Sequence, residues 1–91
     1  MKERRSKLQI LADILEALAQ SGEMNISQLL TAANLSYDRL SKYLSELEAN
    51  NLVVVERQSL EVKIKPTSKG LSFLQEYKKI KEIAIAFGIS L

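Results

Sequence analysis

The chain is 91 residues long, which is enough for one small domain, and it carries a formal net charge of only +2. It contains no cysteine and no histidine, which excludes disulfides, thiolate metal sites and the commonest general base. Its charges are unevenly spread, since residues 8–35 hold no lysine or arginine whereas 1–7 and 57–69 hold four each. This asymmetry suits a polyanionic partner on one side of the molecule.

The sequence gives no sign of targeting or of membrane insertion. Its charged start, MKERRSKLQI, lacks the apolar segment of a signal peptide. The longest apolar run, residues 83–87, is far too short to cross a bilayer. We therefore expect a cytoplasmic protein that is not bound to a membrane, needs no cofactor and has no evident small-molecule ligand.

The first predicted helix spans about 5–20, and Ser21 and Gly22 end it. Asp13 and Glu16 lie three residues apart on it, but no basic or nucleophilic residue accompanies them. We therefore interpret them as a solvated face and not as an acid–base pair. The apolar residues at helical spacing predict one buried stripe: Leu8, Leu11, Ile14, Leu15 and Leu18.

Two short helices, about 26–33 and 37–49, are predicted on either side of a tight joint. Asn25 and Gln28 have the spacing of a capping box at the start of the first helix. Asn34 tolerates the left-handed conformation that ends a helix, and Ser36 can cap the second helix. Helices with so short a joint cross steeply, as in a helix-turn-helix. The alternative is an ordinary pair of core helices.

A β-hairpin is predicted over residues 52–65. The run 52–57 is rich in branched apolar residues, and from Leu60 onward apolar and charged residues alternate. The turn lacks the Asn-Gly signal, so the register is uncertain. We prefer a three-residue loop, 58–60, because it places Arg57 opposite Glu61, whereas a two-residue loop, 58–59, would oppose two glutamates. Pro66 ends the second strand.

Thr67 can cap a final helix that runs to about Phe87, just before Gly88. Such a helix is about 30 Å long, which is more than the rest of so small a domain can cover. Five of its residues are spaced 4-3-4-3, the pattern of a coiled-coil seam. We predict that they form a homodimer interface: Phe73, Tyr77, Ile80, Ala84 and Phe87.

The order of these elements predicts a mainly α protein with a small β-hairpin (α+β), that is, a winged helix-turn-helix with a long C-terminal dimerisation helix. Within one structural domain, we assign 1–66 to DNA binding and 67–91 to homodimerisation. The sequence also resembles the small archaeal winged-helix DNA-binding proteins. The resemblance is carried by RSKLQILADILEAL at 5–18, NLSYDRLSKYLSELEANNLV at 34–53 and TSKGLSFLQEY at 67–77. It implies a homodimer on duplex DNA, acting either as a local transcriptional regulator or as an abundant chromosome-coating protein.

The outer face of the helix predicted over 37–49 carries short polar and forked basic side chains, which read base edges. We expect its N-terminal half to enter the major groove, with Arg39 contacting guanine. We expect Lys2, Arg4 and Arg5 to form a flexible N-terminal arm. This arm and the wing, which is the hairpin at about 52–65, should hold phosphates. The predicted DNA-binding residues are Arg4, Arg5, Ser36, Tyr37, Arg39, Ser41, Lys42, Ser45, Arg57, Gln58, Ser59, Lys63 and Lys65.

Three functions are compared. The first is a dimeric DNA-binding regulator, with a non-specific, nucleoid-associated chromatin protein as its variant. The second is a winged-helix module that binds protein and not DNA; it is favoured by the low net charge and by Asp38, Glu46 and Glu48 on the predicted DNA-reading helix. An enzyme is not indicated, because no nucleophile, base constellation or glycine-rich phosphate loop is present. The expected partners are double-stranded DNA and a second copy of the chain.

Overall fold

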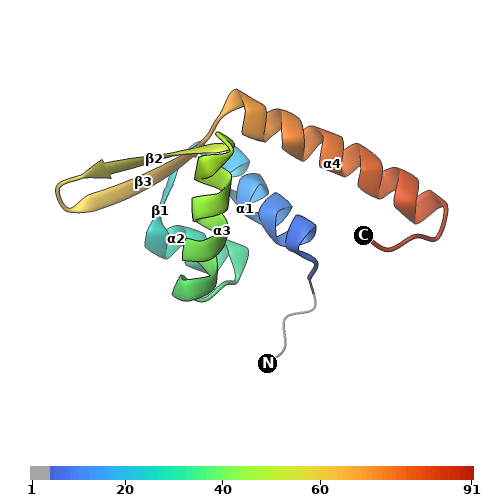
Figure 1. Ribbon diagram of the computed structural model, residues 1–91, viewed down its shortest axis with the longest axis horizontal. Helices are drawn as coiled ribbons and strands as arrows, with labels where there is room; N and C mark the ends of the chain where they lie inside the picture. The colour runs from blue at the N-terminus through green and yellow to red at the C-terminus, as the bar shows by residue number, and fades with distance from the viewer. Residues whose placement is uncertain (1–4) are drawn as a thin grey trace.

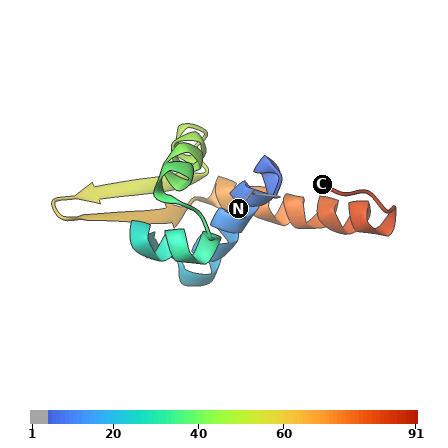
Figure 2. The ribbon, with the colours of Figure 1, turned by 90° about the horizontal axis from the view of Figure 1, so that it is seen from below.

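The computed structural model describes residues 5–91, over which four helices accompany a three-stranded antiparallel sheet (Figure 1). The β2–β3 hairpin and α4 extend in opposite directions from the body formed by the other helices (Figures 1 and 2). In chain order the elements are α1 (Lys7–Ser21), β1 (Met24–Asn25), α2 (Ile26–Ala33), α3 (Tyr37–Ala49), β2 (Val53–Gln58), β3 (Glu61–Pro66) and α4 (Ser68–Ala86).

Local capping sets the bounds of α2 and α3, which agree with the predicted ones. The Asn25 side chain accepts a hydrogen bond from the Gln28 backbone N–H, and Gln28 Oε1 accepts one from the Asn25 N–H, so the capping box is confirmed. Asn34 ends α2 in the left-handed conformation, with φ of 55°. Ser36 Oγ accepts from the Arg39 N–H and starts α3. The joint is therefore only three residues long, as a helix-turn-helix requires.

Helix α1 lies at the centre of the core, so residues on more than one side of this helix are buried. It begins at Lys7, two residues later than predicted, because the Ser6 side chain accepts from the Gln9 N–H. It contacts α2, α4 and β3. Ile10, which the predicted stripe omitted, is buried, whereas Leu8 is exposed. A single stripe was thus too narrow a prediction for a helix that packs on several sides.

The sheet differs from the prediction in two respects. Strand β1 was not foreseen; it pairs with β3 through Met24–Ile64 and Asn25–Lys63, so that β3 is the central strand. The preferred three-residue hairpin loop is also wrong, because Gln58 pairs with Glu61 and leaves a two-residue turn, 59–60. This register sets Glu56 opposite Lys63, a favourable pairing of charges.

The same register explains the positions of the wing's apolar residues. Ile64 is fully buried and pairs with Val55, which packs against the core. Leu60, the residue at which the alternation of apolar and charged residues begins, lies in the turn and is 99% exposed. Burial of Ile64 therefore sets the register at the base of the hairpin.

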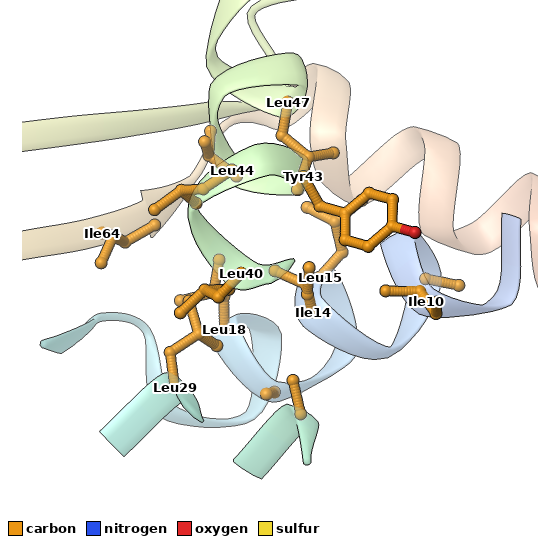
Figure 3. Close-up of a cluster of buried hydrophobic side chains, with 14 of the residues drawn as sticks. Ile10, Ile14, Leu15, Leu18, Leu29, Leu40, Tyr43, Leu44, Leu47 and Ile64 are labelled. Atoms are coloured by element: carbon orange, nitrogen blue, oxygen red, sulfur yellow. The ribbon is translucent and has the colours of Figure 1, made fainter. Parts of the chain in front are cut away.

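One face of α3 packs into the core beside α1 and β3 (Figure 3). Four residues of α3 are buried there: Leu40, Tyr43, Leu44 and Leu47. They meet the α1 residues Ile14, Leu15 and Leu18, together with Ile64 of β3, in one cluster. Since burial of a large apolar side chain contributes about 1.5–3 kcal/mol, this face is the one that fixes α3, and its other face remains available.

Helix α4 is anchored to the chain that leaves α3. The Thr67 backbone N–H donates to Leu52 O, and its hydroxyl donates to Asn51 O over 2.7 Å. Lys69 Nζ donates to Asn50 O. A Cβ at Gly70 would lie 2.1 Å from Leu52 O, so only glycine allows this approach. Across residues 5–91, none of the helices combines the length and the apolar character needed to cross a membrane.

Candidate nucleic-acid interface

The outer face of α3 carries exposed polar side chains next to the wing. Ser41, Lys42 and Ser45 are exposed on the side opposite the core. Ser36 and Tyr37 are exposed at the N-terminal end of the helix. Both ribbon views place α3 beside the base of the β2–β3 hairpin, and α3 contacts β2 (Figures 1 and 2). These five predicted contact residues therefore lie on one accessible side of the molecule.

Two basic residues of α3 differ in their surroundings. Lys42 is exposed, and its Nζ lies 5.7 Å from the centre of the Tyr43 ring, within cation–π range. Arg39, which we expected on the exposed face, is half-buried. Arg39 is therefore less accessible than the three neighbouring polar residues of this face, Ser41, Lys42 and Ser45.

A crevice of about 150 Å³ separates α3 from the wing. Ser41 and Ser45 line it from α3, and Arg57 lines it from β2. Apolar residues such as Leu44 and Val62 also line it. The fold thus brings together side chains that are more than ten positions apart in the sequence.

Every basic residue of the wing is paired with a carboxylate of the same chain. Arg57 donates through both terminal nitrogens to Glu48 of α3, over 3.1 and 3.2 Å. Lys63 lies 3.2 Å from Glu23, the residue before β1. Lys65 lies 3.6 Å from Glu23 and 3.4 Å from Glu56. The predicted phosphate-binding cations are therefore largely neutralised in the free protein.

These pairs also shift the pKa values of their members. Hydrogen bonding from Arg57 holds the pKa of the Glu48 carboxyl below its ordinary value, and Glu48 in turn raises the pKa of the Arg57 guanidinium. Lys63, by hydrogen bonding and by its charge, lowers the pKa of Glu23, and Glu23 raises the pKa of Lys63. All four groups are consequently charged at neutral pH.

Arg5 does not belong to a flexible arm, contrary to our expectation. Its guanidinium donates to Asp13 Oδ2 over 2.9 Å, to Ala33 O over 2.8 Å and to Asn34 O over 2.9 Å. The side chain is only 18% exposed. Arg5 therefore holds the joint between α2 and α3, and its charge is directed into the protein. The other arm residues, Lys2 and Arg4, lie outside the described part of the chain.

The predicted seam on α4 is divided by the packing of the chain itself. Tyr77 and Ala84 are only 7% and 6% exposed, and Phe73 is half-buried against the core. After Gly88 the chain turns back, and the Ile89 N–H donates to Ala84 O over 2.7 Å. Tyr77 and Ala84 are therefore already covered within the protomer.

The other two seam residues remain open. Ile80 is 52% exposed and Phe87 is 75% exposed. Ile83, which the predicted seam omitted, is also exposed, and its spacing places it on the same side of α4. The accessible apolar stripe is thus Ile80, Ile83 and Phe87. Helical spacing alone did not predict which residues of α4 remain exposed, because the returning C-terminal segment determines which side of α4 is buried.

This arrangement defines a class of protein. Two helices with a three-residue joint, a core that leaves polar residues of α3 exposed, and a hairpin beside α3 form a winged helix of the kind found in DNA-binding proteins and transcriptional regulators. The chain belongs to the winged helix-turn-helix family, whose sequence model matches residues 4–85.

Solved structures share this fold. The chain is similar to Sso10a-2, a DNA-binding protein from Sulfolobus solfataricus, with a TM-score of 0.77 and 22% identity over 92% of this chain and 90% of that one. It is also similar to AbsC, a MarR family transcriptional regulator from Streptomyces coelicolor, with a TM-score of 0.74 and 26% identity over 85% of this chain. The transcriptional regulator BldR from Sulfolobus solfataricus gives a TM-score of 0.69 and 21% identity over 84% of this chain.

The two regulators are longer, and this chain spans 55% of AbsC and 60% of BldR. The comparison with curated proteins gave no match. The resemblance to small archaeal winged-helix DNA-binding proteins is confirmed at the level of the fold.

Proposed function

We propose that the protein is a homodimeric transcriptional regulator that binds duplex DNA with α3 in the major groove and the wing on the flanking backbone. The observation that carries this proposal is the free polar face of α3, which lies beside the wing while the opposite face is buried. The fold shared with a DNA-binding protein and with two transcriptional regulators supports it. Action on chromosomal DNA would place the protein in the cytoplasm, on the nucleoid.

The roles within this interface follow from side-chain chemistry. Ser41, Lys42 and Ser45 can reach bases or phosphates, and Arg39 is the candidate for a forked contact to guanine. The exposed hydroxyls at the start of α3, Ser36 and Tyr37, can donate to a phosphate. In the wing we assign backbone contacts to Arg57, Gln58, Ser59, Lys63 and Lys65. Arg5 is left out, because its guanidinium is bound to backbone carbonyls.

The proposed dimer uses the exposed stripe of α4. Full burial of a large apolar side chain contributes about 1.5–3 kcal/mol, and Ile80, Ile83 and Phe87 would each add the part of it that belongs to their exposed surface, before the costs of association. An antiparallel pairing of two α4 helices along this stripe would be isologous, with Ile83 near the two-fold axis and Ile80 against Phe87 of the partner subunit. Two copies of α3 would then suit half-sites about one helical turn, roughly 34 Å, apart.

The test measures binding of fluorescent duplex DNA across a salt series. A random duplex and fragments of the protein's own promoter region would be titrated in parallel. A DNA-binding protein should lose affinity steeply as salt rises, because phosphate contacts release counterions. A regulator should favour one promoter fragment, whereas a chromatin-type protein should bind all fragments alike.

The paired wing cations favour a second candidate, a winged-helix module that binds a protein. Arg57, Lys63 and Lys65 already have carboxylate partners, and the net charge is only +2. Absence of DNA retention even at low salt would contradict the first proposal and leave this one.

A further inference from the structure

We propose that Glu48 is an intramolecular competitor of DNA phosphate. It occupies the guanidinium of Arg57 and so weakens the contact of the wing with duplex DNA. This inference rests on the proposed DNA binding and adds to it a residue that limits affinity from within the interface.

The geometry is that of a carboxylate in the place of a phosphate. Glu48 receives two nearly equal hydrogen bonds, from Arg57 Nη1 over 3.1 Å and from Nη2 over 3.2 Å. A phosphate with two free oxygens binds a guanidinium through the same forked pair of donors. Glu48 and a DNA phosphate therefore compete for one pair of N–H groups.

The Arg57–Glu48 pair lies between the two elements that we propose to contact DNA, α3 and the wing. Glu48 stands on α3, three residues after Ser45, and Arg57 stands on the neighbouring strand of the wing. Both side chains line the crevice between α3 and the wing. A duplex that lies against α3 and the wing together therefore meets a neutralised pair at this point.

The ion pair between Arg57 and Glu48 is formed in the free protein, but a competing anion can break it. Arg57 lowers the pKa of Glu48, so the carboxylate stays ionised at neutral pH. Arg57 is exposed and Glu48 is half-buried, and ion pairs in such surroundings exchange readily with solvent and with other ions. A well-placed phosphate can therefore take the guanidinium, but it must first displace Glu48.

The experiment is a double-mutant cycle on a random duplex. Glu48→Gln keeps the length of the side chain and removes its charge, and Arg57→Ala removes the group for which the two anions compete. We would measure the affinity of the wild type, both single variants and the double variant across a salt series, with thermal unfolding as the check on folding. Glu61→Gln is the charge control, since Glu61 lies in the wing but makes no ion pair within residues 5–91.

We expect Glu48→Gln to tighten binding about twofold to fivefold and to steepen the salt dependence by about one unit. Glu61→Gln should tighten it less. In the Arg57→Ala background, Glu48→Gln should have no more effect than the charge control has, because the competition no longer exists.

A folded Glu48→Gln protein that binds no more tightly than the wild type would overturn the inference. So would a gain that persists in full without Arg57, since Glu48 would then act as a general negative charge. Wild-type binding with steep salt dependence but no gain in Glu48→Gln would overturn the inference alone. Absence of DNA binding by the wild type and by Glu48→Gln at low salt would overturn the proposed function with it.

Discussion

Arg5 reaches from the segment before α1 to the joint of the helix-turn-helix. It supplies donors to two carbonyls, those of Ala33 and Asn34, at the end of α2, where a helix leaves its last carbonyls unpaired. It also bridges to Asp13 of α1. The angle between α2 and α3 thus depends on a residue that belongs to neither helix.

We expect Arg5→Ala to lower the free energy of unfolding by about 1–3 kcal/mol, because the carbonyls of Ala33 and Asn34 lose charged donors. Denaturant unfolding measures this. Arg5→Lys is the matched control, and it should restore only part of the loss because lysine lacks the second terminal nitrogen with which Arg5 reaches Asn34 O. A stable Arg5→Ala protein with a shallower salt dependence of DNA binding would instead assign Arg5 to the DNA interface.

Arg39 is the residue whose loss should change sequence preference. We expect Arg39→Ala to weaken binding to a preferred site by about 1–3 kcal/mol and to weaken binding to random DNA less, because a guanine contact is lost only at the preferred site. Competition titrations with the two duplexes measure the difference. An equal loss on both would make Arg39 a backbone contact.

At the scale of the elements, the sequence correctly predicted the helix bounds that depend on local interactions. The bounds of α2 and α3 follow from Asn25, Asn34 and Ser36, whose partners lie within a few residues. Strand β1 has only two residues and exists through its pairing with β3, some forty positions away, so no local pattern indicates it. The hairpin register likewise depends on the burial of Ile64. The predicted register compared only the charges that would face each other across the hairpin, and such a comparison takes no account of burial.

In the candidate site, too, local features were predictable from the sequence and features that depend on distant contacts were not. The exposed polar face of α3 follows from helical periodicity, and the structure bears out the exposure of Ser41, Lys42 and Ser45. The role of Arg5 was not predictable, because its two carbonyl acceptors lie 28 and 29 residues further along the chain. The pairing of Arg57 with Glu48 requires α3 and β2 to lie side by side, and only the folded chain provides this.

The contact between α4 and the chain after α3 gives a prediction about Gly70. A Cβ there would lie 2.1 Å from Leu52 O, which is backbone and cannot move aside cheaply. We expect Gly70→Ala to lower the free energy of unfolding by about 1–3 kcal/mol through overpacking. Ser72→Ala, an exposed change in the same helix, is the control for thermal unfolding. An unaltered melting temperature in Gly70→Ala would show that α4 can shift away from Leu52.

The wing should loosen in acid. The pKa values of Glu23 and Glu48 are lowered in the folded protein, so their stabilising contribution is present above the ordinary carboxyl pKa of 4.5 and is lost as the pH falls below it. NMR shifts of wing amides between pH 6 and pH 3 would follow the change. A protein with both Glu23→Gln and Glu48→Gln should show a weaker dependence over this range, and an unchanged dependence would assign the effect to other carboxyls.

At the scale of the whole molecule, the exposed stripe on α4 is the surface that we propose for dimerisation. We expect Ile80→Asp to yield monomers, because it places a carboxylate without a partner in the apolar interface of the proposed dimer. The fold should survive, since Ile80 is already 52% exposed in the protomer. Sedimentation measures the mass, and DNA binding should weaken along with dimerisation.

Ile85→Asp is the matched control, because Ile85 is exposed but lies off the stripe on α4. It should leave the oligomeric state unchanged. A wild type that sediments near the protomer mass of 10.2 kDa at micromolar concentration would contradict the dimer and the paired half-sites.

The bonds that join the start of α4 to the end of α3 have a mechanical consequence. Thr67, Lys69 and Gly70 contact the chain at 50–52, directly after α3, so we expect α3 and α4 to turn together. In a dimer α4 would then act as a lever arm. With 19 residues it is about 28 Å long, so a turn of one such helix by about 10° around its far end would displace its α3 by about 5 Å. Whatever alters the angle between two such helices would alter the spacing of DNA sites that the pair can span, without touching a single residue that meets the DNA.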